Sequence, residues 1–141
     1  MVKQKLTLSE GSKQGLFFLF IGGMAAFVHF LSLLFFVQIL EIQPNFANIY
    51  AFLIAFCCGF IGHLNFTFKI KEQTKRWKSK LGKWFLSSIF GFMLNQIIFV
   101  CGTHLFGEQY YVLIWIVATG LVTMMTFLLA KFWAFKGAQA S

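Results

Sequence analysis

Charged residues are scarce in this chain, and their scarcity excludes an ordinary soluble domain. They make up 11% of the 141 residues, whereas soluble proteins average about 25%. A soluble domain of this size needs charged residues along its surface helices, but three long apolar stretches carry none and a fourth carries only Lys131. The sequence therefore predicts that lipid, and not water, surrounds most of the chain.

Acidic residues are absent from all four apolar stretches. The chain has four in total, and they lie at Glu10, Glu41, Glu72 and Glu108. Enzymatic catalysis needs an acid, a base, a nucleophile or a metal held in a fixed geometry, so we expect no enzyme. A proton-coupled drug exporter needs a titratable acid inside the membrane, and the sequence counts against that class too.

Cysteine and proline are also few. Cys57, Cys58 and Cys101 are odd in number and lack the spaced Cys or His partners of a zinc site. We interpret them as small core fillers and expect neither a metal nor a cofactor. A single proline is typical of uninterrupted helices.

The apolar stretches are long enough to cross a bilayer as helices. A hydrocarbon core of about 30 Å needs about 20 apolar residues at 1.5 Å per residue. The predicted spans are 16–40, 46–68, 85–106 and 110–135. The sequence thus predicts an all-α integral membrane protein, a single membrane domain over 1–141 with four transmembrane helices.

Basic residues alternate with the spans in a pattern that predicts topology. Three lysines precede the first span, seven basic residues lie between Lys69 and Lys83, and two lysines close the fourth. The two turns that follow the first and third spans carry Glu41 and Glu108 instead. Because Lys and Arg near span ends stay in the cytoplasm, we expect both termini and a basic loop at 69–84 on the cytoplasmic side. The net charge of +8 therefore indicates topology and not nucleic-acid binding.

The two halves of the sequence resemble each other. The second span ends Phe66-Thr67-Phe68-Lys69 and the fourth ends Trp133-Ala134-Phe135-Lys136. The same offset, 108 − 41 or 67 residues, pairs Glu41 with Glu108. It also relates two ridges of mostly small residues, Ala47, Ala51, Ala55, Gly59 and His63 in span two and Ala118, Val122, Thr126 and Ala130 in span four. We expect two repeated helical hairpins of the same orientation, with the ridges facing other helices.

Four groups of residues carry a resemblance to a known family. They are Gly22-Gly23, Ala47-Asn48 followed by Ala51-Phe52, Phe66-Thr67-Phe68-Lys69, and Lys131-Phe132-Trp133-Ala134-Phe135. In this order and spacing, over roughly 17–135, the chain resembles the GtrA-like proteins. The resemblance implies a bacterial cytoplasmic (inner) membrane protein of cell-surface polysaccharide assembly, which handles polyprenyl-phosphate-linked sugars. It supports this class of ligand more than an individual site, because His29, Gly59 and His63 depart from the family pattern.

Such a lipid presents an apolar tail and an anionic headgroup, so its binder needs a cation and amide donors near the interface. We expect Lys131, His63, Asn65 and Lys69 to form this headgroup site, with the two hairpins converging on it. Deeper polar residues cost free energy in hydrocarbon unless they are hydrogen-bonded. His29, Asn48, Asn95, Gln96 and Thr123 form the predicted polar seam, either as interhelical hydrogen bonds or as a path for a sugar.

Two functions fit these residues best, and a small-molecule exporter is a weaker third option. The first is a flippase that passes the sugar through the polar seam while the polyprenyl tail stays among membrane lipids, and four helices are so few that we expect a homodimer. The alternative is a membrane scaffold that anchors a partner glycosyltransferase through the basic loop and moves nothing.

Overall fold

The computed structural model describes residues 10–68 and 77–138, and they form helices and short turns. Helix α1 spans Glu10–Gln38 and α2 spans Pro44–Gly62, continuing as a π-helix, η1, over His63–Phe68. Helix α3 spans Trp77–Phe106, and α4 spans Tyr111–Ala138 after the short 3-10 turn η3 at Glu108–Tyr110. All four α-helices contain a segment long and apolar enough to cross a membrane. The predicted fold class, an all-α protein with four candidate spans, is therefore confirmed.

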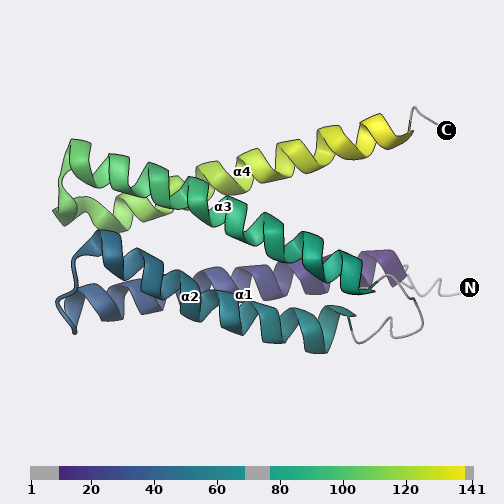
Figure 1. Ribbon diagram of the computed structural model, residues 1–141, viewed down its shortest axis with the longest axis horizontal. Coiled ribbons are helices and arrows are strands. Elements are labelled where there is room, and N and C mark those ends of the chain that lie inside the picture. The colour runs from purple at the N-terminus through teal and green to yellow at the C-terminus, as the bar shows by residue number, and fades with distance from the viewer. Residues whose placement is uncertain (1–9, 69–76, 139–141) are drawn as a thin grey trace, which may run out of the picture.

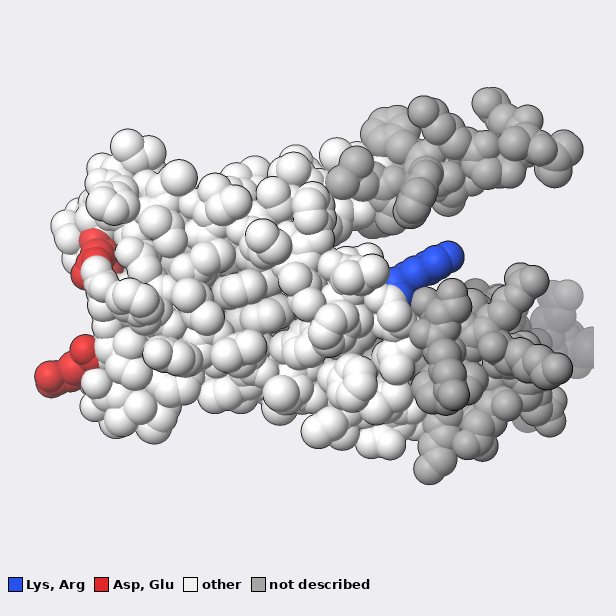
Figure 2. Space-filling view, viewed as in Figure 1, with Lys and Arg blue, Asp and Glu red and all other residues white. Residues whose placement is uncertain are grey.

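The helices form two hairpins side by side (Figure 1). Both interhelical turns lie at one end of the bundle, called here the turn end, and the start of α1 and the end of α4 lie at the other, the terminal end. Helices α1 and α2 pack along their length, whereas α3 and α4 cross and then diverge toward the terminal end. Figure 2 shows acidic side chains at the turn end and a basic side chain at the other. Which end faces the cytoplasm remains a prediction.

Both turns use backbone conformations that suit a tight reversal. Pro44 occupies the first turn of α2, where its missing N–H leaves no bond unmade. In the other turn, Gly107 has φ 100° and ψ 150°, a region that is essentially restricted to glycine. Glu41 also has a positive φ of 53°. These turns place α1 beside α2 and α3 beside α4 with few intervening residues.

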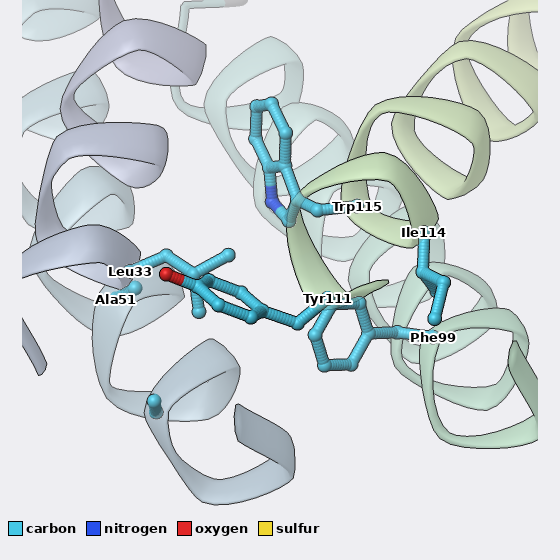
Figure 3. Packing of buried hydrophobic residues seen from close by; sticks show 7 residues of the cluster. Leu33, Ala51, Phe99, Tyr111, Ile114 and Trp115 are labelled. Atoms are coloured by element: carbon cyan, nitrogen blue, oxygen red, sulfur yellow. The ribbon is translucent and has the colours of Figure 1, made fainter. Parts of the chain in front are cut away.

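The best-buried core lies in the half of the bundle near the turn end. Its members come from all four helices and are Leu33, Ala47, Ala51, Phe99, Tyr111, Ile114 and Trp115. Figure 3 shows the Tyr111 ring extending from α4 toward Leu33 on the first hairpin. Large apolar side chains cover the outer faces of the helices, among them Leu105 at 78% exposed. That distribution suits a protein surrounded by lipid.

Three details differ from the sequence analysis. Cys57, Cys58 and Cys101 are exposed on the helix surfaces, so their interpretation as core fillers is wrong. The predicted loop at 69–84 is shorter, because α3 already begins at Trp77. The π-helical turn at His63–Phe68 was not predicted, since no periodicity of apolar residues distinguishes it from an α-helix.

Candidate functional site

A hydrogen-bonded cluster around Asn48 joins the two hairpins in the middle of the bundle. Asn48 is fully buried on α2, and its Oδ1 lies 2.9 Å from Nε2 of His29 on α1. Its Nδ2 lies 2.7 Å from Oε1 of Gln96 and 3.4 Å from Oδ1 of Asn95, both on α3. Asn95 in turn donates to Oγ1 of Thr119 on α4 at 3.2 Å. All four helices therefore meet through polar side chains at this point.

The direction of these bonds follows from the groups available. Asn48 Oδ1 accepts only, so His29 Nε2 must carry a hydrogen and donate to it. The indole N–H of Trp115 also only donates, and it lies 3.4 Å from the same His29 nitrogen. A ring nitrogen that carries a hydrogen has no lone pair left to accept a second bond. We therefore assign the shorter contact, from His29 to Asn48, as the hydrogen bond. Trp115 instead packs edge-on against the imidazole, at a ring separation of 5.3 Å.

The cluster continues toward the turn end. Gln96 Nε2 donates to the backbone carbonyl of Asn45 at 2.9 Å, and Thr103 donates to the Asn45 side chain at 2.8 Å. We call the seven connected residues the polar network; they are His29, Asn45, Asn48, Asn95, Gln96, Thr103 and Thr119. Apart from the Trp115 indole N–H, no buried side-chain nitrogen or oxygen in the described part of the chain lacks a partner.

Two further contacts tie the hairpins together near the turn end. Gln38 donates to the Tyr111 hydroxyl at 3.1 Å, and Gln43 donates to Glu108 at 2.6 Å. The second contact is exposed and connects one turn to the other. These bonds join the two hairpins across their interface over the half of the bundle that contains the core.

The structure unites four of the five predicted seam residues. His29, Asn48, Asn95 and Gln96 are bonded in one network, whereas Thr123 is exposed and does not belong to it; its backbone carbonyl accepts from Thr126. Sequence reasoning left out Asn45 and Thr103. The spacing of Gln96 and Thr103, two helical turns apart on one face of α3, is the signal that relates them.

Of the four predicted headgroup residues, the structure describes the side chains of His63 and Asn65. His63 is 2% exposed, and its ring lies 4.9 Å from that of Trp84, whereas Asn65 is exposed. Lys69 lies outside the described residues, and Lys131 lies in α4 with its side chain outside them. Figure 1 shows the last turns of α4 well apart from α2 and η1, with α3 between them in that view. The site formed by Lys131, His63, Asn65 and Lys69 therefore stays a prediction.

An aromatic cluster holds α3 against α2 near the terminal end. The Trp84 ring stacks on Phe56 at 5.5 Å and tilts against Phe60 at 6.0 Å. A Cβ added at Gly59 would lie 3.9 Å from Trp84, so the indole also covers that glycine. His63 is thus buried as part of the contact between α2 and α3.

The comparisons with known proteins agree with this architecture. The sequence model described as the GtrA/DPMS transmembrane domain matches residues 17–135, which include the whole polar network. No curated protein and no solved structure matches the chain. Because the match extends over most of the sequence, the chain belongs to the GtrA/DPMS transmembrane domain family.

Proposed function

We propose that the protein translocates polyprenyl-phosphate-linked sugars across the bacterial cytoplasmic membrane for cell-surface polysaccharide synthesis. The observation that carries this proposal is the polar network, which runs between four apolar helices and consists of amides, hydroxyls and one imidazole. The GtrA/DPMS transmembrane domain family, to which the chain belongs, is associated with the handling of lipid-linked sugars. Sugar hydroxyls both donate and accept, so they are suited to exchange bonds with such groups.

The proposed path separates the ligand into two parts. The polyprenyl tail stays in the surrounding lipid, and the sugar replaces bonds of the polar network one at a time. The phosphate remains near the basic terminal end, which we place in the cytoplasm, where Lys131, His63, Asn65 and Lys69 are our candidates for binding it. The chain itself makes and breaks no covalent bond.

A homodimer fits this proposal. Within one chain, the end of α4 lies apart from the end of α2 (Figure 1). A C2 dimer supplies a second set of cations and amides, so that Lys131 of one protomer and His63 of its partner contribute to one headgroup site.

Transport by the purified protein tests the proposal. The protein is reconstituted into liposomes with a fluorescent polyprenyl-phosphate hexose, and the fraction of lipid that reaches the other leaflet is followed by quenching. We expect the wild type to transport, and we expect Lys131→Ala and Gln96→Leu to transport less while eluting as folded protein. Lys136→Ala is the matched control, since it removes a lysine further from the spans. Equal transport by all four proteins would contradict the assigned residues.

The scaffold alternative gives the opposite result. A purified wild type that moves no lipid, together with loss of a co-purifying glycosyltransferase on charge reversal at Lys75, Arg76 and Lys78, would establish the scaffold instead.

A further inference from the structure

The described side chains in the terminal halves of α1 and α4 lose the burial that the same two helices have near the turn end. On α1, the stripe that faces α4 is buried at Leu33 but exposed at Gly22, and Leu19 is 70% exposed. On α4, Ala118 and Val122 are buried, whereas Thr126 on the same stripe is exposed. Burial is therefore lost along both helices toward the terminal end, where Figure 1 shows α4 standing clear of the other helices.

The corresponding contact on the other side of the bundle is closed. The offset of 67 residues relates Gly59 to Thr126 and Trp84 to Phe17. Ala25 of α1 and Trp84 of α3 both cover Gly59, whereas Thr126 is exposed and Phe17 lines a groove beside Cys58 and Gly62 of α2. Gly59 is thus covered by neighbouring helices, whereas the related position on α4, Thr126, is exposed and Phe17 lies beside α2.

The two related helices are otherwise buried alike. The buried positions of α2 include Pro44, Ala47, Asn48, Ala51 and Ala55, and at the same offset α4 buries Tyr111, Ile114, Trp115, Ala118 and Val122. The correspondence ends one turn later, where Gly59 is buried and Thr126 is exposed. The opening is therefore a local departure from a shared pattern and not a general difference between the hairpins.

Polar groups lead from this opening into the polar network. Thr126, Thr123 and Thr119 are spaced three and four residues apart, so their hydroxyls lie along one side of α4. The single hydroxyl hydrogen of Thr126 is directed at the carbonyls of Val122 and Thr123, at 2.9 and 3.0 Å from Oγ1, which leaves the oxygen able to accept. Thr119 accepts from Asn95, the next member of the polar network.

We propose that the opening between the terminal halves of α1 and α4 is the lateral portal through which the headgroup of an anionic, sugar-bearing lipid enters the polar network. This inference rests on the proposed function and specifies where the ligand enters. Three features select the occupant. The hydroxyl row on α4 suits a polyhydroxyl group, the exposed apolar faces of both helices suit a lipid tail, and the excess of basic residues at the terminal end, with Lys13 exposed on α1, suits a phosphate.

Site-specific photo-crosslinking tests the portal directly. A benzophenone amino acid is placed at Thr126 or, as a matched control, at Met124, which is 58% exposed and lies on the opposite face of α4 at nearly the same depth. The full-length protein is irradiated in vesicles of phosphatidylethanolamine and phosphatidylglycerol containing a radiolabelled polyprenyl-phosphate hexose. We expect about tenfold more labelling from Thr126, corresponding to about 1.4 kcal/mol of preference for the portal. Equal labelling from the two positions would overturn the inference.

Blocking the portal gives a second measurement. A Cβ at Gly22 meets nothing within 4 Å, so Gly22→Trp fills the opening without displacing a packed neighbour, and Gly120→Trp is the control on an equally open part of α4. We expect Gly22→Trp to reduce transport several-fold and Gly120→Trp to leave it unchanged. Wild-type transport by Gly22→Trp would contradict the portal. Selective labelling at Thr126 by a protein that transports nothing would support the portal as a binding site and refute translocation.

Discussion

Replacement of Asn48 by leucine tests whether the polar network holds the two hairpins together. The Asn48 side chain takes part in three hydrogen bonds, which reach His29 on α1 and Asn95 and Gln96 on α3. Leucine has a similar volume and introduces no polar group. The substitution therefore removes the bonds while leaving the packing of α2 nearly unchanged.

The expected loss of stability follows from the groups left behind. Interhelical hydrogen bonds in membranes contribute about 0.6 kcal/mol each on average, so three of them contribute about 2 kcal/mol. His29 is 8% exposed and Asn95 is 7% exposed, so water cannot replace Asn48 at either side chain. A buried polar group without a partner costs about 1–3 kcal/mol. We therefore expect Asn48→Leu to lower the free energy of unfolding by about 2–4 kcal/mol.

Unfolding in bicelles, followed by steric trapping or by titration with a denaturing detergent, measures this difference. Thr126→Val is the matched control, because Thr126 is exposed and its hydroxyl bonds only to carbonyls of its own helix. We expect it to change stability by less than about 0.5 kcal/mol, as is usual for surface substitutions. The double variant Asn48→Leu/Gln96→Leu should lose less than the sum of the single losses, since the two side chains share one bond. A loss below about 0.5 kcal/mol for Asn48→Leu would refute the reasoning.

Three further predictions concern glycines and topology. Gly102→Ala should destabilise the protein by about 1–3 kcal/mol through overpacking, because the new Cβ would lie 2.5 Å from the buried Ile114. Gly120→Ala meets open space and should not destabilise it, and the same unfolding assay compares the two variants. Gly107→Ala should cost about 1–3 kcal/mol, since its φ of 100° and ψ of 150° suit only glycine, and a loss within error of zero would contradict that assignment. Glu41→Cys, in a background without the three native cysteines, should react with a membrane-impermeant maleimide from outside intact cells, whereas Ser79→Cys should react only after permeabilisation; the reverse result would invert the predicted topology.

The four spans were predictable because the free-energy cost of placing charged or unpaired polar groups in hydrocarbon is large. A charged group or an unpaired backbone amide is so costly in hydrocarbon that uncharged stretches of sufficient length identify the membrane-crossing helices. The same cost made the polar seam visible, since His29, Asn48, Asn95 and Gln96 stand out against apolar neighbours and must find partners. Their bonding to one another follows from their similar depth within the spans.

Other features were not predictable, because a membrane helix has an apolar environment on its lipid-facing side and on its protein-facing side. The contrast in polarity that separates buried from exposed residues in a soluble protein is therefore missing. In water a buried small residue differs from an exposed one, but lipid and protein interior are equally apolar, so the exposure of Cys57, Cys58 and Cys101 left no trace in the sequence. The ridge of small residues has the same ambiguity. It is buried along α2 at Ala47, Ala51, Ala55 and Gly59 and at His63 in η1, but on α4 it is buried at Ala118 and Val122 and exposed at Thr126.

The unequal packing of the two hairpins indicates which helix moves if the portal opens and closes. Helix α1 approaches α2 closely near the terminal end, where a Cβ added at Gly62 would lie 3.0 Å from Ile21. Between α3 and α4 the close approach is instead near the turn end, at Gly102 and Ile114, and the contact of Gly91 with Val122 is already looser at 3.8 Å. Beyond Val122, Thr123 and Thr126 are both exposed. Displacing this part of α4 therefore breaks fewer contacts than displacing α1. We expect α4 to be the helix that moves, with the contact of its Ile114 with Gly102 on α3 as the fixed point.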